Sequence, residues 1–280
     1  MARGIATTRT ARAGIAGTAL VLALTAFAAA QPAPAPPAPA GTLVSKACAS
    51  GAAALMGEQP LPNVAAALAA GRTLRILSMG AAPGRIGRHG GTYTAQIEAM
   101  LQAALKVTRI EIINRGVSGE LAAAAAVRMR NEVALEEPDL VLWQVGTNDA
   151  LAYVPAEEFA QTVHDQLAWL KAHKVDVVLV GLQFAPQMLR DAHYVKIRET
   201  LRAAAAQEKV IVVRFFEAVE ILNRGDDAAI PAADEFERSE AGYNCLSQYV
   251  ARAITLGVFA RHLPNRQPTA PPAPPAPKPQ

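Results

Sequence analysis

The sequence predicts a three-layer α/β/α fold built around a five-stranded parallel sheet. Short β-branched runs alternate with longer stretches of helical periodicity, and much of the 51% hydrophobic content is alanine. Aromatic residues make up only 5% of the chain, which suits alanine-rich helices on a sheet better than an all-β sandwich. Strands that alternate with helices are joined by right-handed crossovers, which place helices on both faces of the sheet.

The predicted strands are apolar runs of strand length, separated by helical patterns. In chain order, strands are expected at Leu74–Met79, Thr108–Ile113, Leu140–Gln144, Val175–Gly181 and Val210–Phe215. Helices are expected at Tyr93–Leu105, Gly119–Glu136, Pro155–His173, Arg190–Gln207 and Glu240–Ala260. Ligands bind to such sheets at the carboxyl ends of the strands, so the loops after the strands are where chemistry is expected.

Both ends of the chain differ in composition from the predicted fold. Residues 1–30 combine arginines, an apolar run and small residues at its exit, which predicts a secretory signal peptide, with a membrane anchor as the alternative. Residues 31–41 and 264–280 are rich in proline and alanine and are expected to form a linker and a disordered tail around a domain at 42–263. We therefore expect an exported protein, periplasmic or extracellular, with no stable membrane span after signal removal.

Charge and cysteine content narrow the expected partners and compartment. The net charge of +3 comes from Arg3, Arg9 and Arg12 in the predicted signal, whose thirty residues hold no acidic residue. Because the rest of the chain is neutral overall, nucleic acid is not an expected partner. Cys48 and Cys245 are expected to form one disulfide in an oxidising compartment, and two buried free thiols are the alternative.

Four polar segments lie beside the predicted strands and the last helix. Gly80–Gly87, Asn114–Gly119 and Gly146–Asp149 follow the first three strands, and Asp234–Glu237 precedes the helix. Their order and spacing resemble the SGNH/GDSL hydrolases, whose motifs are a G-x-S nucleophile loop, N-x-G-x-x-G, G-x-N-D and D-x-x-H. The resemblance runs from about Arg72 to Arg261.

This resemblance implies a flavodoxin-like five-stranded sheet and hydrolysis of ester bonds, with no cofactor and no metal. By position, the Gly119 backbone N–H and the Asn148 side-chain amide would form an oxyanion hole. Such donors stabilise the negative charge that develops on a carbonyl oxygen during acyl transfer. Taken alone, Asn148 and Asp149 could also form only an Asx turn or a helix cap.

Two positions depart from the family pattern. The serine of G-x-S, counted from Gly80, is Ala82, and the histidine of D-x-x-H, counted from Asp234, is Glu237. Asp234, the acid that would orient a histidine, is retained. Without the nucleophile and its base, the ordinary double-displacement mechanism is lost, so we expect a catalytically impaired member.

Other groups near these segments could replace the lost pair. Ser78 and Ser118 carry hydroxyl groups without an assigned base, and His89 is more typical of a solvated loop. Asp234 and Glu237 could activate water together, although a solvated acidic loop is the more common arrangement.

Three hypotheses of function follow. The first is a noncatalytic protein that binds an acyl ester, a glycan or a partner protein. The second is an active esterase or acylhydrolase, acting on the carboxylic esters of an acylated glycan or lipid through a relocated nucleophile or activated water. The third is a structural envelope protein that acts through its proline-rich tails. A small acyl or glycan ligand is the expected partner, and the oligomeric state is not predicted.

Overall fold

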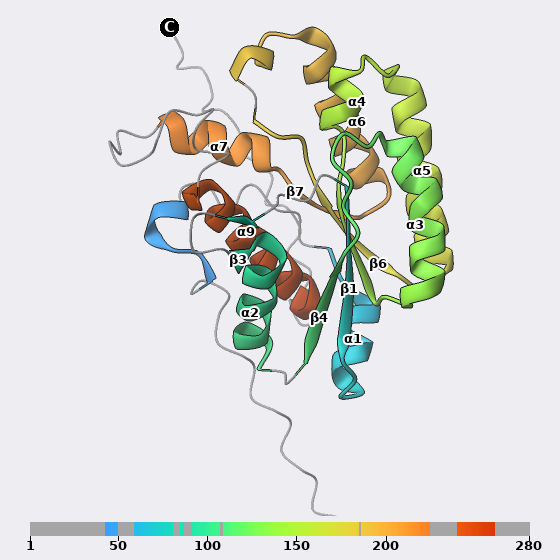
Figure 1. Ribbon diagram of the computed structural model, residues 1–280, viewed down its shortest axis with the longest axis vertical. Coiled ribbons are helices and arrows are strands. Elements are labelled where there is room, and N and C mark those ends of the chain that lie inside the picture. The colour runs from blue at the N-terminus through green and yellow to red at the C-terminus, as the bar shows by residue number, and fades with distance from the viewer. Residues whose placement is uncertain are drawn as a thin grey trace, which may run out of the picture. The chain divides into compact units, whose positions relative to one another are not determined.

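A five-stranded, all-parallel sheet forms the centre of the protein (Figure 1). The computed structural model describes residues 43–49, 59–80, 85–86, 91–106, 109–184, 186–224 and 240–260. The strands are β1 (Leu74–Gly80), β4 (Ile110–Asn114), β5 (Leu140–Gln144), β6 (Asp176–Val180) and β7 (Ile211–Val213). Their order, β4-β1-β5-β6-β7, is the flavodoxin-like order that the resemblance implies, so the predicted fold class is confirmed.

The central strands are apolar along their whole length because both faces of the sheet are covered. All residues of β6 are buried, and β5 is buried up to Trp143, whose ring has no exposed surface. β1 is buried except at Arg75. Each aliphatic side chain removed from water in this way contributes about 1.5–3 kcal/mol to the free energy of folding.

Three helices cover one face of the sheet, and the first of them follows the loop that contains Gly119. They are α3 (Ala122–Glu136), α5 (Ala156–Ala172) and α6 (Ala192–Gln207), which pack side by side in this order (Figure 1). The buried stripe of α3 consists mainly of alanines, followed by Met129 and Val133. Small side chains let α3 lie close to β1, as expected for an alanine-rich helix on a sheet.

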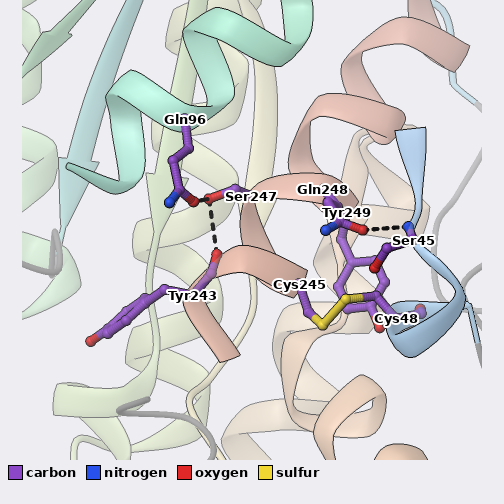
Figure 2. Close-up of a disulfide and its surroundings, with 8 residues drawn as sticks. All are labelled: Ser45, Cys48, Gln96, Tyr243, Cys245, Ser247, Gln248 and Tyr249. Carbon is purple, nitrogen blue, oxygen red and sulfur yellow. Dashed lines mark hydrogen bonds between the residues drawn. A yellow bond between two sulfur atoms is a disulfide. The ribbon is translucent and has the colours of Figure 1, made fainter. Parts of the chain in front are cut away.

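Two helices pack against each other on the opposite face. α2 (Tyr93–Leu105) and α9 (Glu240–Phe259) form this pair (Figure 1). The hydroxyl of Ser247 on α9 lies 3.1 Å from Gln96 Oε1 on α2, as Figure 2 shows. Two helices that are far apart in the sequence, the first near residue 93 and the second ending at residue 259, therefore form one layer.

A disulfide between Cys48 and Cys245 fastens the N-terminal segment to α9 (Figure 2). The two Cα atoms are 5.4 Å apart and both cysteines are buried, so the predicted bond is confirmed and the alternative of free thiols is wrong. Hydrogen bonds flank it: Ser45 N–H donates to Gln248 Oε1 at 2.6 Å, and the Tyr249 hydroxyl donates to the Cys48 carbonyl at 2.8 Å. Burial raises the pKa of Tyr249 to about 12.

Most predicted elements are present, with two corrections. The predicted strand Val210–Phe215 ends at Val213, because Phe215 already begins the helix α7 (Phe215–Arg224). The predicted helix Gly119–Glu136 begins only at Ala122, because Gly119 has a φ of +79°, which no α-helix allows.

Several short elements were not predicted. They are η2 (Lys46–Cys48), α1 (Pro62–Ala69), the strand pair β2 (Arg85–Ile86) and β3 (Gly91–Thr92), α4 (Thr147–Leu151) and η4 (Pro186–Met188). No helix within the described ranges is long and apolar enough to cross a bilayer. The predicted signal peptide, linker and tail lie outside these ranges and stay predictions.

Candidate functional site

The carboxyl ends of β1, β4 and β5 bring the predicted motif segments to one edge of the sheet. Gly80 pairs in register with Gln144, and Ser78 pairs with Asn114. Beyond β4 the chain continues along β1, where Val117 N–H donates to the Gly80 carbonyl at 3.0 Å. The loops that follow β1 and β4 therefore start side by side, as a flavodoxin-like site requires.

Gly80 ends β1 in a position that only glycine fits. Its φ is +90°, and a Cβ built on it would lie 1.9 Å from the Gln144 carbonyl oxygen. The end of β1 is thus pressed against β5, and the chain leaves the sheet from a fixed point. Ala82 comes two residues later in the sequence but lies outside the described residues, as do Asp234 and Glu237.

Gly119 lies in the loop after β4 and presents its backbone to solvent. The loop starts with an Asx turn, in which Asn114 Oδ1 accepts the Gly116 N–H at 2.9 Å. A Cβ on Gly119 would meet no atom within 4 Å, so its φ of +79° rather than lack of space favours glycine. Among the described residues, no acceptor lies within hydrogen-bond distance of the Gly119 N–H.

Asn148 lies in α4, directly after β5, and points at the loop that carries Gly119. Its Nδ2 donates to the carbonyl oxygen of Glu120, the residue after Gly119, at 3.0 Å. An amide nitrogen has two protons, so the second remains available. The structure therefore brings the two predicted donors, Gly119 and Asn148, to neighbouring points of the same loop.

Asp149 anchors the same junction from the neighbouring position. Its Oδ1 accepts the N–H of Ala122, the first residue of α3, at 2.9 Å, so this carboxylate satisfies a free N–H at the start of α3 and does not cap its own helix α4. The side chain is buried, and its Oδ2 has no partner among the described residues. Desolvation by this burial raises the pKa of the Asp149 carboxyl, although hydrogen bonds from the Ala122, Asp149 and Gly146 backbones oppose the shift.

We expect Asp149→Asn to make stability less dependent on pH. The folded-state pKa of Asp149 lies above its unfolded value of about 3.9, so its stabilising contribution is complete below that pH and is lost as pH rises through the folded pKa. The melting temperature of the variant should therefore rise relative to that of the native protein as the pH increases from 3 to 7. The exposed Asp165, changed to asparagine, is the control, and a constant difference would contradict the assignment.

The other candidates from the sequence have less suitable surroundings. Ser78 is buried within β1, whereas Ser118 is exposed in the loop beside Gly119. The three histidines in the described ranges do not hydrogen-bond to Ser118. His164 contacts the Glu208 carboxylate, His173 contacts the Trp169 carbonyl, and His193 stacks on the Tyr153 ring. His89 lies outside the described residues, and the described side chains contain no group of three potential metal ligands.

An ion pair behind the loop was not predicted from the sequence. The Glu120 carboxylate is 8% exposed and is held by Arg128 through two hydrogen bonds, Nε to Oε1 at 2.8 Å and Nη2 to Oε2 at 2.7 Å. The two residues lie eight apart, on either side of a loop–helix boundary. Because Glu120 lies in the loop before α3, the helical spacing of α3 does not apply to it, and the sequence pattern did not indicate the pair.

The parallel sheet, its strand order and the grouped motif loops define an SGNH/GDSL hydrolase fold. Within that class, the Non-GDSL lipase-like family matches residues 47–260, and the chain belongs to this family.

Individual relatives agree with this assignment. Esterase TesA of Pseudomonas aeruginosa is 29% identical over 106 residues, which are 38% of this chain and 52% of TesA, so the match spans about half of TesA. The lipase/acylhydrolase from Enterococcus faecalis has a similar structure, with a TM-score of 0.55 and 20% identity over 70% of this chain and 100% of that one. Axe2, an acetylxylan esterase from Geobacillus stearothermophilus, has a TM-score of 0.53 and 20% identity over 65% of this chain and 94% of its own. These two structures share the fold.

Proposed function

We propose that this protein binds an acyl or carboxylate group of a ligand without hydrolysing it. The observation that carries the proposal is the hydrogen bond from Asn148 Nδ2 to the carbonyl of Glu120, which brings the Asn148 amide to the residue next to Gly119, in the loop region beyond the carboxyl ends of β1 and β4. At the nucleophile position Ala82 provides no attacking group, and at the base position Glu237 replaces the histidine that would activate it. The match to an esterase, TesA, supports an acyl group as the part that is recognised.

The chemistry of the two donors sets a preference among ligands. In an active hydrolase, an oxyanion hole acts mainly on charge that appears in the transition state. Without a nucleophile that charge never develops, so a ligand that already carries it gains more than a neutral ester does. We therefore expect carboxylates and phosphonates to bind more tightly than the corresponding esters.

We also propose that the protein works outside the cytoplasm. The predicted signal peptide at residues 1–30 motivates this, and the Cys48–Cys245 disulfide supports it, because such bonds persist in oxidising compartments. Fractionation of cells that express the full chain, with the thiol state of Cys48 and Cys245 measured in each fraction, checks it.

The purified protein is expected to bind butylphosphonate in calorimetry and to leave p-nitrophenyl butyrate intact. Asn148→Ala removes one donor to an anion and should weaken phosphonate binding about tenfold or more. Asn131→Ala, on the exposed side of α3, is the matched control and should bind like the native protein. Sustained ester turnover that disappears in Asn148→Ala would instead establish the active-esterase hypothesis.

The paired change Ala82→Ser with Glu237→His serves as the reference for the same ester assay. Turnover in this double variant, absent in either single variant, would place both positions beside Gly119 and Asn148. Phosphonate binding without any turnover in the double variant would contradict the assigned positions while leaving the binding proposal intact.

A further inference from the structure

Glu120 stands between the two proposed donors. Its N–H follows Gly119 directly in the chain, and its carbonyl oxygen receives Asn148 Nδ2 at 3.0 Å. A displacement of Glu120 would therefore move both donors, one through the backbone and the other through the hydrogen bond. Gly119 has no side chain, and its N–H has no protein acceptor within the described ranges. The contacts that hold the loop in place are therefore those of Glu120.

The side chain of Glu120 is held by Arg128 on α3. Two nearly parallel hydrogen bonds of 2.8 and 2.7 Å join the guanidinium to the carboxylate, and this fork fixes orientation as well as distance. The carboxylate is 8% exposed, so water competes weakly for it. A second contact, 3.9 Å from Arg128 Nη1 to Met79 Sδ, brings the same guanidinium to the residue before Gly80.

Arg128 is itself held by further charges on the same surface. Its Nη1 lies 3.7 Å from Glu132, which pairs with Arg115 at 3.0 Å. Arg115 follows β4 and also pairs with Glu136 at 2.7 Å, and its N–H donates to the Ser78 carbonyl at 2.8 Å. The network thus ties the start of the Gly119 loop, at Arg115, to its end, at Glu120, through side chains of α3.

We propose that Arg128 is a positioning residue. By holding the Glu120 carboxylate, it fixes the positions of the Gly119 N–H and the Asn148 amide relative to each other. Arg128 touches no ligand in this scheme and acts only through Glu120. The consequence for ligand binding rests on the proposed function, whereas the consequence for the two donors in the free protein does not. The donors are thus pre-organised before a ligand arrives, which lowers the entropy lost on binding.

The test follows the Gly119 amide and the Asn148 side-chain amide by NMR in the ligand-free protein. In Arg128→Met, hydrogen exchange of the Glu120 amide, which donates to the Val117 carbonyl, should quicken at least about tenfold, and the Gly119 amide and Asn148 Nδ2 signals should shift and broaden. Arg128→Lys keeps the charge but not the fork, so an intermediate effect is expected and the variant should fold readily. Butylphosphonate binding should weaken about three- to tenfold in Arg128→Met.

Two further variants separate positioning from general loss of structure. Arg130→Met is the matched control, because Arg130 lies on the same helix but contacts Gln166 and the Trp169 ring. It should leave the Gly119 and Asn148 signals unchanged at a similar melting temperature. Glu120→Gln combined with Arg128→Met should be no worse than the more severe single change, because the two residues act as one unit.

The outcomes for this inference and for the proposed function are distinct. Unchanged Gly119 and Asn148 signals in folded Arg128→Met or Arg128→Lys would overturn the positioning role, whatever the ligand data are. Additive effects of Glu120→Gln and Arg128→Met would overturn it too. If the signals respond as expected but the native protein does not bind butylphosphonate, the positioning role stands and the proposed function fails.

Discussion

Replacing Gly80 with alanine is expected to prevent stable folding or to lower the free energy of unfolding by more than about 4 kcal/mol. The new Cβ would lie 1.9 Å from the Gln144 carbonyl oxygen, inside the van der Waals contact of any carbon and oxygen. The position of the Cβ is fixed by the backbone of β1 and the oxygen belongs to the backbone of β5, so neither atom can rotate away as the end of a side chain would. Chemical denaturation, or the yield of soluble protein where the variant does not fold, measures the effect.

Gly119→Ala is the matched control for this prediction. Gly119 also has a positive φ, +79° against +90° at Gly80, but a Cβ there would meet no atom within 4 Å. The alanine should therefore introduce only backbone strain, which lowers the free energy of unfolding by about 1 kcal/mol. Equal losses for the two variants would mean that β1 and β5 approach less closely at Gly80 than the structure indicates.

Removing the disulfide, with Cys48→Ser and Cys245→Ser together, is expected to destabilise the protein by about 3–5 kcal/mol. The cysteines are 197 residues apart, so the bond removes a large number of conformations from the unfolded chain. The variant also leaves two hydroxyl groups in a site where both cysteines are 2% exposed. Urea denaturation monitored by circular dichroism provides the comparison with the native protein.

Reduction of the native protein gives an independent measurement of the same bond. With excess dithiothreitol, its urea midpoint should fall to that of the double serine variant, whereas the variant itself should not respond. A native protein whose midpoint is indifferent to the reductant would show that the bond contributes little to stability.

The sheet could be predicted from the sequence because its strands are buried on both faces. Runs such as Leu140–Gln144 are apolar at every position, and helices between them leave only a parallel sheet as the arrangement. Boundaries were harder where local patterns overlap. Phe215 extends the apolar run of β7, but it also starts the helical spacing of α7, and the amphipathic stripe of that helix decides the outcome.

Short elements escaped prediction because their stability is not local. α4 spans only Thr147–Leu151, too short to form alone, and is held by contacts with α6. α1 begins with Pro62 at its first position, a signal of a helix start that was available in the sequence.

Some residues of the candidate site could also be predicted from the sequence, and others could not. Gly119 and Asn148 were predicted because their motifs match the SGNH/GDSL pattern, which has a glycine and an asparagine after fixed strands. The Arg128–Glu120 pair could not, since only the packing of α3 against β1 brings Arg128 to the loop. Glu120 therefore had no distinguishing feature in the sequence, although its carbonyl receives Asn148.

The Cys48–Cys245 bond also determines how the protein would respond to tension. If the two ends of the chain were pulled apart, the force would pass from the N-terminal segment through the sulfur atoms directly into α9. The residues between Cys48 and Cys245, with the whole parallel sheet and the Gly119 loop, would lie outside this covalent path. A protein anchored at one end and attached to a partner at the other could thus transmit force while its candidate site kept its shape.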